Sequence, residues 1–129
     1  MQSTKPQLAI VGTGMSGLAC ADSLGQHFEI SLFDKSRGLS GRLSTRRGEA
    51  HAFDHGAQYF RAETELFANW LEPFESDGHL QLWKPRHVNF LSDGSYKAHS
   101  DPASKLVFVS GMSAIGKALL TNRPDWKLY

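Results

Sequence analysis

The sequence lacks the features that mark several large classes of protein. Fourteen Lys and Arg residues stand against thirteen Asp and Glu, so the net charge is only +1. General nucleic-acid binders carry a basic excess over a whole face, and this chain has none. The longest uncharged run, residues 6–21, is shorter than the about 20 apolar residues that a membrane helix needs. We therefore expect neither nucleic acid nor membrane as a partner.

Cysteine is also scarce, because Cys20 is the only one among 129 residues. No disulfide can form within the chain, which fits a reducing compartment, and we expect the cytoplasm. Cys20 lies in an apolar stretch and is expected to be a small buried side chain. A secretory signal ending at Cys20 is an alternative reading. Three glycines inside the apolar run disfavour it, since a signal helix has no need of them.

The sequence does contain the opening of a nucleotide-binding βαβ unit. Residues 7–11 (QLAIV) are typical of a buried strand, and residues 15–26 have apolar side chains at helical spacing. Residues 28–33 (FEISLF) alternate as a second strand and lead into Asp34. Strand, glycine turn, helix, strand and acid in this order predict an α/β fold of the Rossmann type.

The glycine turn has the spacing of a dinucleotide site. Gly12 turns the chain out of the strand, Gly14 leaves room for a diphosphate, and Gly17 lets the helix pack closely on the sheet. The first helical N–H groups then face the phosphates. Asp34 is expected to accept hydrogen bonds from ribose hydroxyls and to disfavour a 2′-phosphate. FAD and NAD remain as candidate ligands at this point.

The rest of the chain predicts further short elements. Residues 38–48 are expected to form a loop, and 113–120 a helix capped by Ser113. Residues 63–75 are expected to form an amphipathic helix whose apolar face is made by Leu66, Phe67, Trp70, Leu71 and Phe74. Strands are expected at 50–53, at 79–91 and 96–99 around a turn at 92–94, at 105–109 and at 126–129. His51 and His55 are four residues apart but have no third ligand at metal spacing, so we expect no metal site. No catalytic residue can be named.

A basic stretch, KSRGLSGRLSTRR at 35–47, and the segment FDHGAQYF at 53–60 follow the βαβ unit. Together they resemble the amino-terminal part of the flavin-containing amine oxidase superfamily, and most of all its renalase-like, FAD-dependent branch. FVSGMSAIGKALL at 108–120 also resembles that family. One position departs: Ser40 stands where the family usually has glycine, and a positive φ there would strain serine.

The resemblance implies FAD as the cofactor and assigns the basic stretch to it. Arg42, in the loop with Gly41, and Ser16 would contact the diphosphate, and Lys35 would flank the adenosine end. Gln58 and Tyr59 would lie beside the isoalloxazine. The intact relative would pass a hydride from a small amine or dihydronicotinamide donor to the flavin, which oxygen would then reoxidise.

The resemblance also implies a division of the chain and a missing remainder. We expect an FAD-binding segment at 1–76, the first strands of an antiparallel substrate domain at 77–110, and a helix returning to a three-layer FAD domain at 111–129. Family members are longer, so we expect an incomplete fragment that is inactive alone and self-associates through unpaired sheet edges. The alternatives are an NAD-binding oxidoreductase domain and a truncated, non-catalytic module.

Overall fold

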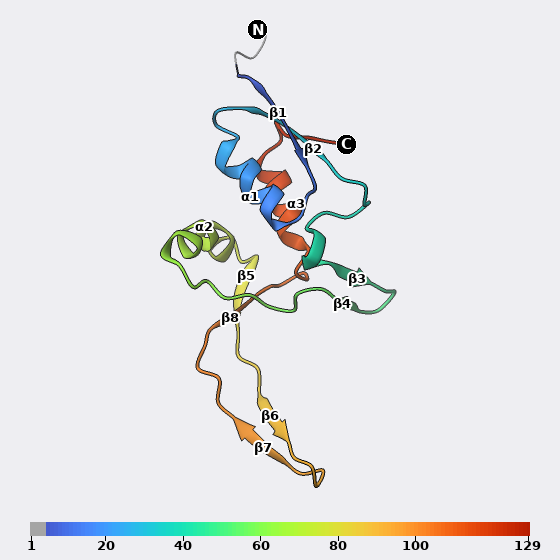
Figure 1. Ribbon diagram of the computed structural model, residues 1–129, viewed down its shortest axis with the longest axis vertical. Helices are drawn as coiled ribbons and strands as arrows, with labels where there is room; N and C mark the ends of the chain where they lie inside the picture. The colour runs from blue at the N-terminus through green and yellow to red at the C-terminus, as the bar shows by residue number, and fades with distance from the viewer. Residues whose placement is uncertain (1–4) are drawn as a thin grey trace. The chain divides into compact units, whose positions relative to one another are not determined.

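The computed structural model describes residues 5–129 (Figure 1). These residues form two compact units. The first unit contains residues up to Gln58 together with 108–129, and the second contains residues 59–107. The helix at 65–76, which we placed with the FAD-binding segment, lies in the second unit. The functional roles assigned to the three segments stay predictions.

A parallel sheet forms the centre of the first unit. Its strands are β1 (Gln7–Val11), β2 (Glu29–Phe33) and β9 (Lys127–Leu128), in the order β1-β2-β9. Val11 is the partner of Phe33 in the β1–β2 register, and Leu32 is the partner of Leu128 in the β2–β9 register. The strand predicted at 126–129 therefore exists and lies beyond β2.

Two helices cover one face of this sheet. They are α1 (Met15–Leu24) and α3 (Ala114–Asn122), which lie side by side in Figure 1. Burial is concentrated there: Leu18 of α1, Leu32 of β2 and Ile115 of α3 are at most 1% exposed. Arg123 donates two hydrogen bonds to Asp22 Oδ1, at 2.9 and 2.7 Å, and so joins the ends of the helices.

The opposite face of the sheet carries exposed apolar side chains. Val11 is 88% exposed, and Phe33, its register partner, stacks on Tyr129 with ring centroids 5.0 Å apart. The described residues thus supply the sheet and one helical layer of the expected three-layer arrangement.

The segment after β2 is more regular than predicted. Instead of a loop through residue 48, it forms a 3₁₀ turn η1 (Gly41–Leu43) and a strand β3 (Thr45–Arg47). β3 pairs antiparallel with β4 (Ala52–Asp54). The strand was not predicted, because its residues (TRR) have no apolar alternation and it is defined by pairing with β4.

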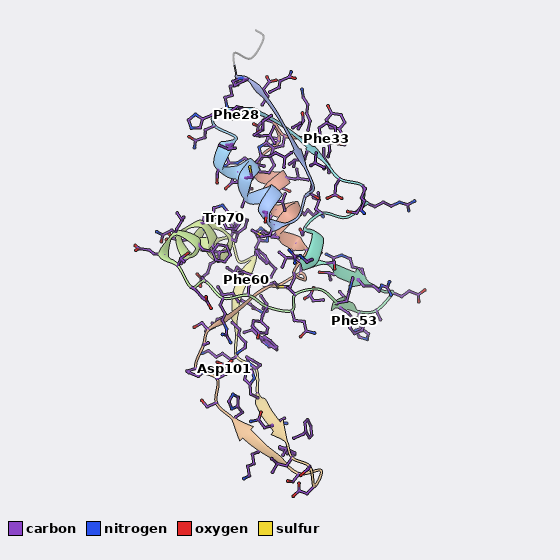
Figure 2. All side chains as sticks on the ribbon, viewed as in Figure 1. Phe28, Phe33, Phe53, Phe60, Trp70 and Asp101 are labelled. Atoms are coloured by element: carbon purple, nitrogen blue, oxygen red, sulfur yellow. The ribbon has the colours of Figure 1, made fainter. Side chains whose placement is uncertain are left out.

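The second unit combines one helix with short strands. These are α2 (Glu65–Ser76), β5 (Leu80–Trp83), β6 (His87–Phe90), β7 (Tyr96–His99) and β8 (Lys105–Phe108), whose last residue belongs to the first unit. β5 pairs with β8, and β6 forms a hairpin with β7. Leu71 and Phe74 are the buried residues of α2. The ring of Phe67 contacts the rings of Phe60 and Trp70, both labelled in Figure 2.

Three expectations about individual side chains are wrong. Cys20 is exposed, because it lies two positions after the buried Leu18 and so points away from the packed face of α1. Leu66 is 83% exposed rather than part of the apolar face of α2. Ser113 stands at the N-cap of α3, but its helical φ and ψ leave its side chain without a capping bond.

Candidate nucleotide site

The glycine turn between β1 and α1 has the form that the sequence predicts. The N–H of Gly12 donates to the carbonyl of Phe33 at 2.7 Å, so the β1–β2 ladder continues into the turn. Gly12 has a φ of 98°, which only glycine adopts without strain. A Cβ built on Gly17 would overlap the carbonyl oxygen of Gly12. The start of α1 therefore packs directly on the turn, as expected for position 17.

The space in front of the turn is open. A Cβ built on Gly12 or on Gly14 would meet no described atom within 4 Å. Gly14 is the N-cap of α1, and Ser16 in the first helical turn is exposed. The first N–H groups of a helix lack intrahelical partners and attract anions. The turn thus presents the N-terminus of a helix and an unfilled volume to a ligand.

The basic stretch returns to this turn. Gly14 and Ser40 form a parallel bridge, and the N–H of Ser40 donates to the carbonyl of Thr13 at 2.8 Å. A Cβ on Gly41 would lie 3.0 Å from the Cα of Gly14. The backbone immediately before Arg42 therefore lies against the start of α1, and the structure brings the two predicted segments together.

The DHGAQ turn at 54–58 packs against the Arg42 loop. The N–H of Ala57 donates to the carbonyl of Arg42 at 2.8 Å, and a Cβ on Gly56 would overlap that carbonyl oxygen. An open pocket of about 630 Å³ lies between the two segments. Its lining residues are Gly41, Arg42, Ser44, His55, Gly56 and Ala57.

Asp54 and Thr45 hold this pair of segments to the residues before α3. Thr45 donates its hydroxyl to Asp54 Oδ1 at 2.5 Å, and the same oxygen accepts from the N–H of Met112 at 2.9 Å. The N–H of Ser113 donates to the Thr45 hydroxyl at 3.1 Å. These two side chains position the pocket wall, a role that the motif match alone did not reveal.

Asp34 stands at the end of β2, where the sequence places a ribose acceptor. Its carboxylate accepts hydrogen bonds from Thr13 and from Ser36. Hydrogen bonds from the Thr13 side chain and from Ser36 hold the pKa of Asp34 well below its usual value. The glycine-turn motif predicts neither of these partners. The Asp-Lys-Ser order at 34–36 is a signal for the Ser36 contact, because serine two positions after aspartate often closes a turn in this way.

The remaining predicted residues are divided between the two units. Lys35 and Arg42 are exposed in the first unit, as is Gln58 at its boundary. Tyr59 belongs to the second unit, where its ring lies 5.9 Å from that of Trp83 and 5.3 Å from the ammonium of Lys105. No group of three or more His, Cys, Asp or Glu side chains within residues 5–129 is placed to hold a metal ion. None of the helices in that range is long and apolar enough to cross a membrane.

The sequence is similar to parts of two longer proteins. The chain is 28% identical to a zeta-carotene-forming phytoene desaturase from Myxococcus xanthus over 88% of its length and 21% of the relative. It is 33% identical to polyamine oxidase 1 of Oryza sativa subsp. japonica over 46% of its length and 12% of the relative. The chain therefore spans about a fifth or less of these relatives.

A solved structure of wild-type putrescine oxidase bound to putrescine shares the fold. Its TM-score is 0.55 at 20% identity, over 77% of this chain and 22% of that one. A putrescine oxidase double mutant gives a TM-score of 0.56 with the same identity and coverage. The solved structures show a shared fold, and the sequence is similar to part of a polyamine oxidase, as the motifs lead us to expect.

A family model describes the region that holds the site. It is the model of the NAD(P)-binding Rossmann-like domain, and it matches residues 10–74, which is 65 of the 129 residues. The matched range begins in β1 and includes the glycine turn, Asp34, the Arg42 loop and the DHGAQ turn. The chain therefore belongs to the NAD(P)-binding Rossmann-like domain family.

Proposed function

We propose that this chain is the amino-terminal, FAD-binding part of an oxidoreductase of the amine oxidase superfamily. One observation carries the proposal: the loop that ends in Arg42 lies against Gly14 at the start of α1. A glycine turn alone serves many nucleotides. A basic loop packed on that turn adds a second set of donors for the same diphosphate.

The residues present fit an adenine dinucleotide. Open space at Gly12 and Gly14 leaves room for a diphosphate beside the N-terminus of α1. Ser16 and Arg42 are both exposed and would hold that group, the Arg42 guanidinium by two parallel hydrogen bonds. Lys35 would flank the adenosine. The pocket between Arg42 and Ala57 is the place for the start of the flavin half.

A bound FAD would supply the hydride acceptor, with molecular oxygen as the final oxidant. The protein would bind, orient and shield the reacting groups, with Gln58 and Tyr59 beside the ring by resemblance to the family. We propose a small amine or a dihydronicotinamide as the donor. The similarity to polyamine oxidase and putrescine oxidase supports an amine, whereas the renalase-like motifs favour the dihydronicotinamide.

The proposal extends to compartment and assembly. The scarcity of cysteine supports the cytoplasm, where thiols stay reduced. Within the described residues β1 pairs only with β2, so its outer edge is open to another strand. We propose that copies of this chain associate through that edge, and gel filtration at several concentrations measures this.

The test of the cofactor compares FAD, FMN and NAD by thermal shift, using the chain and two arginine variants. Arg42→Ala is expected to lower FAD affinity about tenfold or more, because a charge-assisted contact is worth about 1.5–3 kcal/mol. Arg86→Ala removes an exposed arginine of the second unit and serves as the matched control. Stabilisation by NAD without FAD, or equal effects of the two variants, would overturn the proposal.

A further inference from the structure

Asp34 offers no vacant oxygen to a ligand in this structure. Its Oδ2 accepts from the N–H and the hydroxyl of Thr13, at 2.7 and 2.5 Å. Its Oδ1 accepts from the N–H and the hydroxyl of Ser36, at 2.9 and 2.7 Å. A carboxylate has about four lone-pair sites, and the protein itself fills them. A ribose hydroxyl can therefore bind Asp34 only by displacing one of these donors.

The two donor residues differ in how easily they can leave. Thr13 is 0% exposed and lies inside the glycine turn. Displacing it would leave a buried hydroxyl or N–H without a partner, which is costly. Ser36 is exposed, and its hydroxyl oxygen also lies 2.8 Å from the carbonyl of Gly38. One hydroxyl hydrogen serves one acceptor well, so Ser36 already has a second partner in place.

We propose that Ser36 is a specificity-determining residue of the ribose subsite, and that its hydroxyl turns from Asp34 Oδ1 to the Gly38 carbonyl when a ribose hydroxyl binds. This inference rests on the proposed binding of an adenine dinucleotide at the glycine turn. Thr13 keeps Oδ2 throughout, so Asp34 offers one oxygen and recognises one ribose hydroxyl rather than a pair.

The exchange makes the wild-type site tolerant of a missing hydroxyl. When a deoxyribose binds, the Ser36 hydroxyl returns to Oδ1 and the carboxylate loses nothing. The site should still reject a 2′-phosphate. The hydrogen bonds to Asp34 keep the pKa of its carboxyl low, so the carboxylate stays negatively charged and repels the phosphate. The site thus discriminates strongly against an added charge and weakly against a lost hydroxyl.

The test measures the affinities of ADP, 2′-deoxy-ADP and 3′-deoxy-ADP for the full chain by NMR titration. For the wild type we expect both deoxy analogues to bind within about threefold of ADP. In Ser36→Ala, Oδ1 keeps the N–H of residue 36 but lacks the hydroxyl donor. One of the two analogues is then expected to bind about tenfold more weakly than ADP, since a hydrogen bond to a charged group is lost.

The chain supplies a matched control. In the β6–β7 turn, Ser95 donates its N–H and its hydroxyl to Asp93 Oδ1, at 2.9 and 2.6 Å, which is the arrangement that Ser36 makes with Asp34. Ser95→Ala is expected to leave all three affinities unchanged. Ser36→Thr retains the hydroxyl and should restore the wild-type tolerance. Amide spectra of each variant verify that the fold is intact.

The outcomes separate this inference from the cofactor proposal. Equal discrimination in the wild type and Ser36→Ala, or about tenfold discrimination in both, would overturn the role of Ser36 even if FAD binds. The expected ADP pattern with no gain in affinity from FAD would support Ser36 and overturn the flavin proposal. Absence of any ADP shift at millimolar concentration would overturn both.

Discussion

The hydroxyl oxygen of Ser40 accepts a hydrogen bond from the N–H of Gly116, 3.1 Å away and 76 positions later in the sequence. The same hydroxyl donates to the carbonyl of Ser113 at 2.9 Å. Ser40 is completely buried and has a φ of 79°, a conformation that strains serine. A Cβ on Gly116 would lie 2.5 Å from the Ser40 oxygen. Ser40 therefore has a strained backbone, and its hydroxyl holds the first turn of α3 through two hydrogen bonds.

Two substitutions of Ser40 should distinguish the cost of its backbone strain from the contribution of its hydrogen bonds to stability. Ser40→Ala keeps the strain and leaves the Gly116 N–H without its partner, so we expect a loss of about 2 kcal/mol in the free energy of unfolding. Ser40→Gly also removes the bonds but relieves roughly 1 kcal/mol of strain, so its loss should be about half as large. Urea unfolding followed by circular dichroism measures both. An alanine variant more stable than the glycine variant would contradict this account.

An added methyl group should destabilise the fold at Gly17 but not at Gly14. Gly17→Ala would force a carbon into the Gly12 carbonyl, and we expect about 2–3 kcal/mol of destabilisation. Gly14 has a φ of −67° and open space at its Cβ position, so Gly14→Ala should change stability by less than about 0.5 kcal/mol. The alanine at 14 should instead weaken ADP binding, because it occupies the proposed diphosphate space. Equal melting temperatures for the two variants would contradict the close packing at Gly17.

Asp101 gives the second unit a dependence on acid. Its carboxylate accepts from the buried ammonium of Lys105 and from Arg61, the latter at 3.1 Å. The hydrogen bond from Lys105, followed by that from the N–H of Ala103, lowers the pKa of Asp101 to about 2. Because the folded pKa lies below the unfolded value of about 4, the stabilisation is complete above that value and is lost as the pH falls towards 2.

The variant Asp101→Asn tests that dependence. It should be less stable than the wild type at pH 7, since Lys105 then stays buried without an acid, and the gap should narrow between pH 4 and pH 2. Urea unfolding at several pH values measures the gap. A difference that stays constant over this range would show that the ion pair does not carry the acid sensitivity.

The sequence predicted the parts of the fold whose signals are local. The strand at 7–11 has the predicted bounds, and the glycine turn, α1 and β2 follow within two residues of prediction, because apolar periodicity and glycine spacing act over a few positions. The partners of Ser40, Thr13 and Asp54 were not predicted. The contacts of Ser40 with Gly116, of Thr13 with Asp34 and of Asp54 with Met112 join residues that are 21 to 76 positions apart. No pattern in either segment alone encodes such a contact.

In the candidate site, too, local motifs were predicted and contacts between distant residues were not. The approach of the Gly41 loop to Gly14 agrees with the expectation drawn from the family motifs. The four hydrogen bonds to the Asp34 carboxylate were not predicted. Several hydroxyl residues lie near this acid in the sequence, but the sequence does not reveal which hydroxyls point toward the carboxylate. Thr13 does so because it is trapped in a turn that closes on the end of β2.

The exposed side of the β1–β2–β9 sheet has a practical consequence for every titration described above. Val11, Phe33 (labelled in Figure 2) and Tyr129 present rings and methyl groups to water, at 88%, 40% and 65% exposure. Burying apolar surface is favourable by about 25 cal/mol for each square ångström removed from water. At high protein concentration, molecules should therefore associate through this side of the sheet. Dilute samples are therefore the right regime for measuring nucleotide affinity, and a fluorescent apolar dye should compete with aggregation for the same surface.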